Sequence, residues 1–146
     1  MRIFFWAVAW SIAVVCACTE SYDHDPKLAA ARAEDFARTT FVDRDSDKGY
    51  EMLSDSGKRY VSPEIFKETV VKSHPRSYPA RINATDYERM SGEKAIYIYL
   101  NGDNGAENFH YTVTLHGTAA SGYKVTRFTR GASSFISGSS RRPLNR

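Results

Sequence analysis

The side chains best suited to transfer a proton lie in the second half of the chain. Asp86 and His110 are the candidate acid or base groups, and candidate hydroxyl groups come from Tyr87, Tyr97 and Tyr111. A carboxylate or imidazole beside a tyrosine hydroxyl in a closed cavity supports general acid–base catalysis. No spacing in the sequence brings these residues together, so a small cofactor-independent isomerase or lyase that uses such a cavity is the alternative hypothesis.

The histidines and acidic residues lack the spacing of a metal site. His110 and His116 share one face of a predicted strand, but they lie roughly 20 Å apart at about 3.4 Å per residue, which is too far to share one ion. Asp43, Asp45 and Asp47 begin like a calcium loop, yet the loop's glycine and closing glutamate are missing. Serine-nucleophile motifs and phosphate-binding glycine loops are absent from the sequence. We therefore expect no metal and no cofactor.

The first 17 residues have the pattern of a signal peptide. Arg2 supplies a positive charge, and Ile3 to Val15 form an uncharged apolar run of signal-peptide length, shorter than the roughly 20 residues that span a bilayer. Val15, Ala17 and Cys18 resemble the lipobox of bacterial lipoproteins. The resemblance implies cleavage after Ala17 and lipidation of Cys18 with acyl chains such as palmitate. Secretory cleavage without a lipid is the alternative.

By the same resemblance, Cys18 anchors the mature protein to a membrane, and residues 18–25 form the lipidated end and a short polar tether. Thr19 after the cysteine favours, by resemblance to lipoprotein sorting, the outer membrane facing the periplasm. Both cysteines of the chain lie at the proposed cleavage site, so the mature domain is expected to contain no disulfide.

The composition predicts one domain. About 130 residues remain after the proposed cleavage, enough for a single core. The formal net charge of the full chain is +3, a near balance that argues against nucleic-acid binding. The domain is expected at residues 26–131, and the Ser-, Gly- and Arg-rich residues 132–146 are expected to be a disordered basic tail. Its Arg141, Arg142 and Arg146 could contact anionic headgroups, or the tail could be an inert solvated end.

Helices are predicted in the first half of the domain. Asp25–Pro26 combines a capping carboxylate with proline at the first helical position. Asp47 is expected to cap a second, short helix. Ser62–Pro63 opens a third helix, and His74–Pro75 ends it because a residue before proline disfavours the helical conformation.

From residue 80 the apolar period changes to two, which is typical of strands. Four strands separated by turn-forming residues are predicted at Arg81–Met90, Lys94–Leu100, Asn108–His116 and Tyr123–Arg130. A bulge is expected where Arg127 lies beside Phe128, because the alternation breaks there. The order predicts an α+β fold in which N-terminal helices pack on a curved four-stranded antiparallel sheet.

The segment from Ala33 to Val70, together with the later GYKVTRF, resembles small bacterial lipoproteins of the NTF2-like superfamily. The motifs are a first helix with Ala and Phe, a Gly-Tyr-Glu-Met-Leu segment and a Val-Ser-Pro before the third helix. The resemblance implies a cone-shaped, cystatin-like α+β domain over Pro26 to Gly131. That superfamily contains isomerases, dehydratases, transport receptors and domains without assigned chemistry, so the resemblance informs on fold more than on activity.

Strand parity divides the predicted sheet into two faces. The face with Ile96, Ile98 and Leu100 is expected to join the apolar side of the next strand in the core. The opposite face is then lined by Tyr97, Tyr99, His110, Thr112, Thr114 and His116. It is more aromatic than an ordinary wetted surface, so it is the candidate surface for a ligand, a partner or a homodimer. The alternative is a solvated face of strand-favouring residues.

The sequence therefore favours a non-enzymatic envelope lipoprotein, anchored through Cys18, whose domain binds a protein or a small ligand on the periplasmic side. A narrower version of this hypothesis is an inhibitor or immunity protein that acts on another envelope protein. No nucleic-acid partner is expected.

Overall fold

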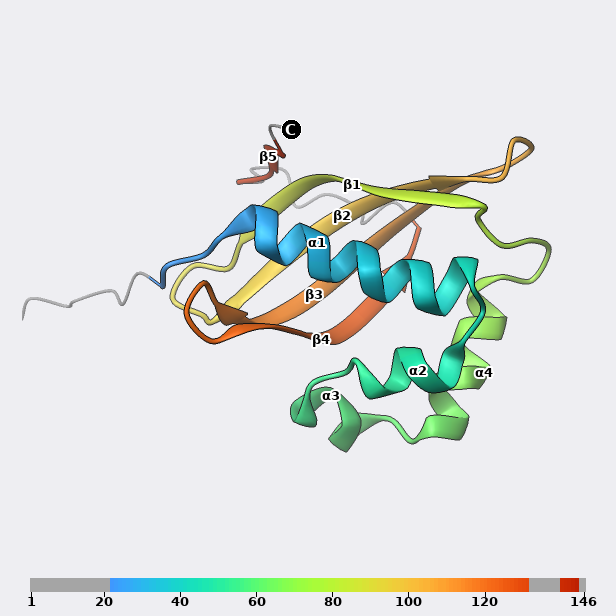
Figure 1. Ribbon diagram of the computed structural model, residues 1–146, viewed down its shortest axis with the longest axis horizontal. Helices are drawn as coiled ribbons and strands as arrows, with labels where there is room; N and C mark the ends of the chain where they lie inside the picture. Colours follow the sequence, from blue (N-terminus) through green and yellow to red (C-terminus); the bar gives the residue numbers. More distant parts are fainter. Residues whose placement is uncertain (1–21, 132–139, 145–146) are drawn as a thin grey trace, which may run out of the picture.

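The structure is a computed structural model of the 146-residue chain, and it describes residues 22–131 and 140–144. The predicted signal peptide and Cys18, the predicted lipidation site, lie outside the described residues. Within them, four α-helices and one π-helix precede a five-stranded antiparallel sheet that does not close, so the α+β prediction is confirmed (Figure 1). No helix in this part of the chain is long and apolar enough to cross a membrane.

The first helix, α1 (Pro26–Ala37), begins as predicted. Asp25 Oδ1 accepts hydrogen bonds from the backbone N–H groups of Lys27 and Leu28 at 3.0 and 3.1 Å. The helix continues directly into a π-helix, η1 (Arg38–Val42). Figure 1 shows α1 lying across one face of the sheet. Its buried stripe consists of Ala29, Ala30, Ala33, Phe36 and Ala37.

The second helix, α2 (Ser46–Glu51), is capped by Asp45, so the prediction that Asp47 caps it is wrong. Asp45 Oδ1 accepts the Lys48 backbone N–H at 3.0 Å, while Asp47 lies in the first turn. Asp45 takes the cap position because its own N–H donates to the carbonyl oxygen of Thr39 in η1. That contact fixes where the chain leaves the preceding helix.

Two more helices follow. The short α3 (Asp55–Tyr60) is separate from α2 and was not expected; Ser54 caps it. The last helix, α4 (Pro63–Ser73), begins after a Ser62 cap and ends at His74, both as predicted. In Figure 1, α2, α3 and α4 lie together on the β4 side of the sheet.

The sheet has the order β4-β3-β2-β1-β5, and all neighbouring strands are antiparallel. The strands are β1 (Arg81–Arg89), β2 (Ala95–Asp103), β3 (Asn108–Thr118), β4 (Gly122–Arg130) and β5 (Arg142–Pro143). The first four match the predicted meander, with β2 and β3 extending further at their ends.

The strand β5 corrects the prediction of a wholly disordered tail. Arg142 and Pro143 pair with β1, and the Leu144 N–H donates to the Thr85 carbonyl oxygen at 2.9 Å. A composition rich in Ser, Gly and Arg gave no sign of this pairing. The tail is ordered here because the outer edge of β1 offers backbone donors and acceptors that a passing segment can satisfy.

Two bulges shape the sheet. In β4 the extra residue is Thr126, one position before the site predicted at Arg127. In β1 the extra residue is Thr85, whose carbonyl oxygen accepts the bond from the tail. Because a bulge bends and twists its strand, both edges of the sheet are displaced from a flat ladder at these points.

The core lies between α1, η1 and the inner face of the sheet. The predicted inward residues are each 1% exposed or less: Ile96, Ile98, Leu100, Phe109, Tyr111, Val113 and Leu115. Phe41 from η1 lies at their centre, stacked on Tyr111 with ring centroids 4.7 Å apart. Phe36 and Phe128 complete this aromatic group, so the concave side of the sheet is filled by side chains.

The π-helix leaves one buried hydroxyl group without a hydrogen-bond partner in the described part of the chain, that of Thr40. Thr40 is fully buried, and burying an unpaired hydroxyl costs about 1–3 kcal/mol. Thr40→Val keeps the shape and removes the hydroxyl, so we expect the free energy of unfolding to rise by about 1 kcal/mol. Urea unfolding measures the change. Thr40→Ser, which keeps the hydroxyl and loses the methyl group, is expected to lower stability; a loss of stability in Thr40→Val would show that the hydroxyl is satisfied.

Candidate functional site

A groove of about 660 Å³ lies where the outer face of the sheet meets α3 and α4. Its walls come from three places: the short helices, the β1–β2 turn and the outer sides of β2, β3 and β4. The lining residues are Leu53, Ser56, Gly57, Tyr60, Val61, Phe66, Thr69, Met90, Glu93, Ala95, Tyr97, Thr114, His116, Thr126, Arg127 and Phe128.

The helix α3 is held against the edge of β4 by backbone contacts. The Ser54 N–H donates to the Val125 carbonyl oxygen at 2.7 Å, and Leu53 forms a parallel bridge with Val125. Gly57 then packs on the bulged residue Thr126. A Cβ at Gly57 would lie 2.8 Å from the Thr126 carbonyl oxygen, so only glycine permits this approach.

Apolar side chains form the part of the groove between the helices and β4. Phe66 and Phe128 meet with their ring centroids 6.0 Å apart, and Leu53 and Val61 extend this surface. Tyr60 stands at the rim with 87% of its surface exposed, which is unusual for a large aromatic side chain. An apolar groove with an exposed aromatic rim is typical of a binding site.

Polar side chains line the part of the groove that lies on the outer sheet face. Tyr97 and Thr114 are cross-strand neighbours there, and Arg127 pairs with Thr114 from the next strand. His116 follows on the same face of β3. Arg127 and His116 are exposed, and neither has a hydrogen bond or ion pair within the described residues. The groove therefore combines an apolar wall with unneutralised basic groups.

The structure divides the six residues of the predicted candidate face. Tyr97, Thr114 and His116 line the groove, whereas Tyr99, His110 and Thr112 do not. The Tyr99 hydroxyl donates to Glu88 Oε2 at 2.9 Å, and burial together with this bond raises the pKa of Tyr99 to about 12.

Tyr99, His110 and Thr112, the three residues of that face outside the groove, contact other parts of the chain or are exposed or buried elsewhere on the sheet. The Arg141 guanidinium lies 4.0 Å above the Tyr99 ring, so the tail covers part of the face. His110 is exposed and hydrogen-bonds Asn101 Oδ1 at 2.8 Å, and Thr112 is 8% exposed. A binding role stays a prediction for Tyr97, Thr114 and His116, which line the groove. The part of the face around Tyr99 is partly covered by Arg141 of the chain itself.

Three groups of the proton-transfer hypothesis, Asp86, His110 and Tyr111, make other contacts in the structure. Asp86 Oδ2 pairs with Arg141 at 2.7 Å, and His110 bonds Asn101. Tyr111 points into the core instead of toward His110. Hydrogen bonding to Arg141 and Thr85 lowers the pKa of the Asp86 carboxyl in spite of the opposing effect of burial, so this carboxyl is not prepared to hold a proton.

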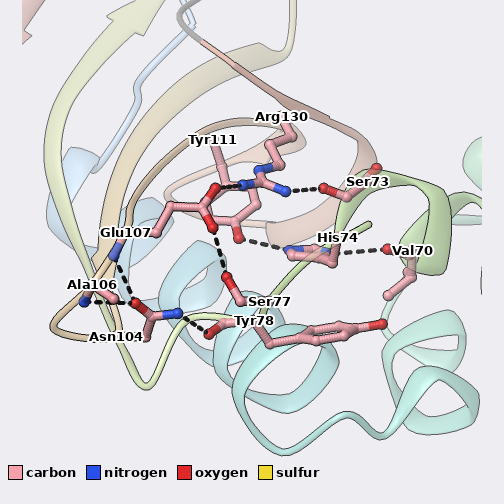
Figure 2. Close-up of polar contacts among 10 residues, drawn as sticks. All are labelled: Val70, Ser73, His74, Ser77, Tyr78, Asn104, Ala106, Glu107, Tyr111 and Arg130. Carbon is pink, nitrogen blue, oxygen red and sulfur yellow. Dashed lines mark hydrogen bonds and ion pairs between the residues drawn. The ribbon is translucent and has the colours of Figure 1, made fainter.

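A second polar cluster, which the sequence did not indicate, lies at the end of α4. Figure 2 shows His74 between Val70 and Tyr111. Its Nδ1 lies 2.7 Å from the Val70 carbonyl oxygen, which can only accept, so Nδ1 carries the proton. Nε2 then accepts the Tyr111 hydroxyl at 2.7 Å. Burial lowers the pKa of His74 and raises that of Tyr111, which keeps both groups neutral.

Charged residues complete this cluster around the same helix end. Arg130 donates to the Ser73 carbonyl oxygen and to Glu107 Oε1, the latter at 2.6 Å (Figure 2). Ser77 donates to Glu107 Oε2 at 2.6 Å. These bonds join the end of α4 to β4 and to the start of β3. Both His74 nitrogens are hydrogen-bonded, and His74 does not line the groove. We therefore interpret the cluster as a set of contacts that stabilise the fold.

The neutral His74 predicts a stability that depends on pH. Because its folded-state pKa is below the usual 6.5, the unfolded chain binds a proton that the folded chain excludes. The free energy of unfolding should therefore fall as the pH drops below about 6.5, by up to about 1.4 kcal/mol per pH unit for this group. Urea unfolding between pH 7.5 and 5 is the measurement, at roughly half-unit steps. His74→Gln, whose amide can bond both partners, should show a shallower dependence of the free energy of unfolding on pH. An equal slope in the variant and the wild type would show that a group other than His74 causes the dependence.

Neither a candidate metal site nor a similar protein helps to assign a function to the groove. Among residues 22–131 and 140–144, no three His, Cys, Asp or Glu side chains are grouped so that they could hold a metal ion. Comparison with protein-family models, with curated proteins and with solved structures finds no match. The function is therefore argued from the geometry of the groove.

Proposed function

We propose that the chain is an envelope lipoprotein, anchored through Cys18, whose NTF2-like domain binds a small, mainly apolar ligand in the groove between α3 and the sheet. The groove itself carries the proposal. Its volume of about 660 Å³ lies within the roughly 300–1,000 Å³ of typical small-molecule sites. The apolar wall of Leu53, Phe66 and Phe128 beside a few polar groups is the usual composition of such a site.

The NTF2-like assignment is supported by the long helix α1 lying across a curved, open antiparallel meander (Figure 1). The filled concave face supports binding over catalysis, because the cavity that an enzyme of this shape would use is occupied by Phe36, Phe41 and Tyr111. An isomerase or lyase remains the second candidate only through the histidine and tyrosine of the groove, His116 and Tyr97.

A small ligand is favoured over a partner that adds a strand because segments of the chain itself cover part of each outer strand of the sheet. The tail pairs with β1, and Leu53 to Gly57 cover β4 at Val125 and Thr126. Addition of a partner's strand, or a homodimer made in that way, would have to displace one of these segments. No contact in the structure specifically favours an inhibitor or immunity function.

Binding is tested with the neutral fluorescent dye N-phenyl-1-naphthylamine, titrated into the mature chain from residue 19 after its folding has been verified by circular dichroism. Saturable fluorescence enhancement is expected in the wild type. Thr114→Trp should fill the groove and abolish it, whereas Thr129→Trp should not, because Thr129 is exposed on the same face outside the groove. Absence of dye binding to the wild type, or an equal loss of dye binding in both variants, would refute the proposal that the groove is a binding site.

The anchor is tested separately. Full-length protein expressed in a bacterium is expected to carry acyl chains by intact mass and to fractionate with membranes, and Cys18→Ser should lose both properties. An unmodified Cys18 at the mature N-terminus would refute the lipoprotein assignment and leave the binding test unaffected.

A further inference from the structure

The charges on the outer sheet face are segregated. On the β1 side, Asp86 pairs with Arg141, and Glu88 accepts hydrogen bonds from Tyr99 and Ser140. The acidic groups there are already satisfied by the chain. On the β4 side the groups are basic and exposed, and within the described residues they have no acidic partner.

Three basic residues make up this unpaired group. His116 lies directly opposite Lys124, and Arg127 lies two cross-strand pairs further along, opposite Thr114. All three side chains are exposed. Side chains that are opposite or diagonal on neighbouring antiparallel strands lie within about 8 Å of one another. The one acidic residue of the groove, Glu93, lies in the β1–β2 turn and makes no ion pair with Arg127 within the described residues.

The anchored end of the domain also lies beside the groove. His24 is 5% exposed, with its Nε2 3.4 Å from the Glu93 carbonyl oxygen, and the Lys94 ammonium lies 5.4 Å from the centre of the Tyr22 ring. Glu93 is itself a lining residue. The chain is thus already packed on the β1–β2 turn at Tyr22.

The distance from the anchor is therefore short. Only four peptide steps separate Cys18 from Tyr22, and a chain of that length reaches at most about 14 Å. If Cys18 is lipidated, the turn that borders the groove must lie close to the membrane surface. The predicted tether of residues 18–25 is shorter than expected, since residues 22–25 belong to the domain.

We propose that the groove binds a single-chain anionic amphiphile, with its alkyl chain along Leu53, Phe66 and Phe128 and its carboxylate at Arg127 and His116. This inference rests on the proposed function and names its ligand class. Charge complementarity selects an anion over a neutral or cationic amphiphile, because Arg127 and His116 have no acidic partner within the described residues. Asp86 and Glu88, on the β1 side of the face, are already paired with other groups of the chain. The membrane-proximal position gives access to molecules of this class.

The test compares two probes that share one alkyl chain and differ at the carboxyl group. Cis-parinaric acid carries a carboxylate on a fluorescent chain, and its methyl ester is neutral. The mature chain, its folding verified, is titrated with each probe at neutral pH, in the wild type, in Arg127→Gln and in the control Arg38→Gln. Arg38 is exposed in η1 and does not line the groove.

The acid is expected to bind about tenfold more tightly than the ester to the wild type, as one charge-assisted hydrogen bond would provide. Arg127→Gln should remove most of that difference by weakening binding of the acid, and Arg38→Gln should preserve the difference. Equal affinity of both probes for the wild type, or no effect of Arg127→Gln, would overturn the anionic ligand while leaving the groove in place. Failure of both probes to bind would instead refute the proposed function on which the inference rests.

Discussion

Phe41→Ala is expected to lower the free energy of unfolding by about 3–5 kcal/mol, the usual cost of removing a buried phenylalanine. Phe41 is fully buried in η1 and stacks on Tyr111 at a centroid distance of 4.7 Å. It also contacts His74 and Phe128 at 5.0 and 5.1 Å. Removing the ring therefore opens a cavity at the point where the helices, the sheet and the polar cluster meet.

The size of this effect is measured by urea unfolding at neutral pH, with Phe41→Leu as the matched variant. Leucine keeps most of the apolar volume and should cost much less than alanine. Because Phe128 lines the groove and packs against Phe41, Phe41→Ala should also weaken binding of the neutral dye. A loss below about 1 kcal/mol in Phe41→Ala would show that the site collapses without a cavity and that Phe41 is not the centre of the core.

Local signals in the sequence predicted the elements whose ends depend on neighbouring residues. Asp25 and Ser62 are followed by proline, and both cap their helices as expected. The strict alternation in β3 placed Phe109 and Tyr111 on the buried face. Capping and strand parity are visible over a few residues, so these predictions required no knowledge of tertiary contacts.

Features that depend on distant contacts could not be predicted in this way. The separate helix α3 exists because Leu53 leaves α2 to bridge Val125, a residue far away in the sequence. The cap of α2 was predicted at Asp47, two residues too late, and the hydrogen bond from the Asp45 N–H to the Thr39 carbonyl oxygen accompanies the cap at Asp45. The strand β5 likewise depends on a distant contact, its pairing with β1.

The candidate site likewise has one part that local sequence predicted and one part that depends on distant contacts. Tyr97, Thr114 and His116 were predicted on one face from parity, and they do line the groove. The apolar wall opposite them comes from α3 and α4, so no pattern along the chain relates the two halves. His74 and Tyr111 are joined by a hydrogen bond across 37 positions, and the sequence indicated only that His74 ends a helix.

The position of α3 leads to the second large effect. Gly57→Val is expected to cost about 1–3 kcal/mol of stability and to weaken dye binding at least fivefold, because overpacking at a backbone contact forces the helix to move. The new Cβ would lie 2.8 Å from the Thr126 carbonyl oxygen, a backbone atom at the bulge of β4. A helix-favouring substitution would normally gain a few tenths of a kcal/mol at this position, so the sign of the effect depends on the contact.

The matched control is Arg59→Val, which introduces the same side chain on the same helix at an exposed position outside the groove. It should leave both stability and dye binding close to those of the wild type. Gly57→Ala should lie between the two, since it adds the colliding Cβ without the extra methyl groups. If Gly57→Val unfolds at the wild-type urea concentration and binds the dye normally, then α3 is not held against β4. In that case the groove would not be a rigid site, because its helical wall is positioned by this contact and by the backbone bond from Ser54 to Val125.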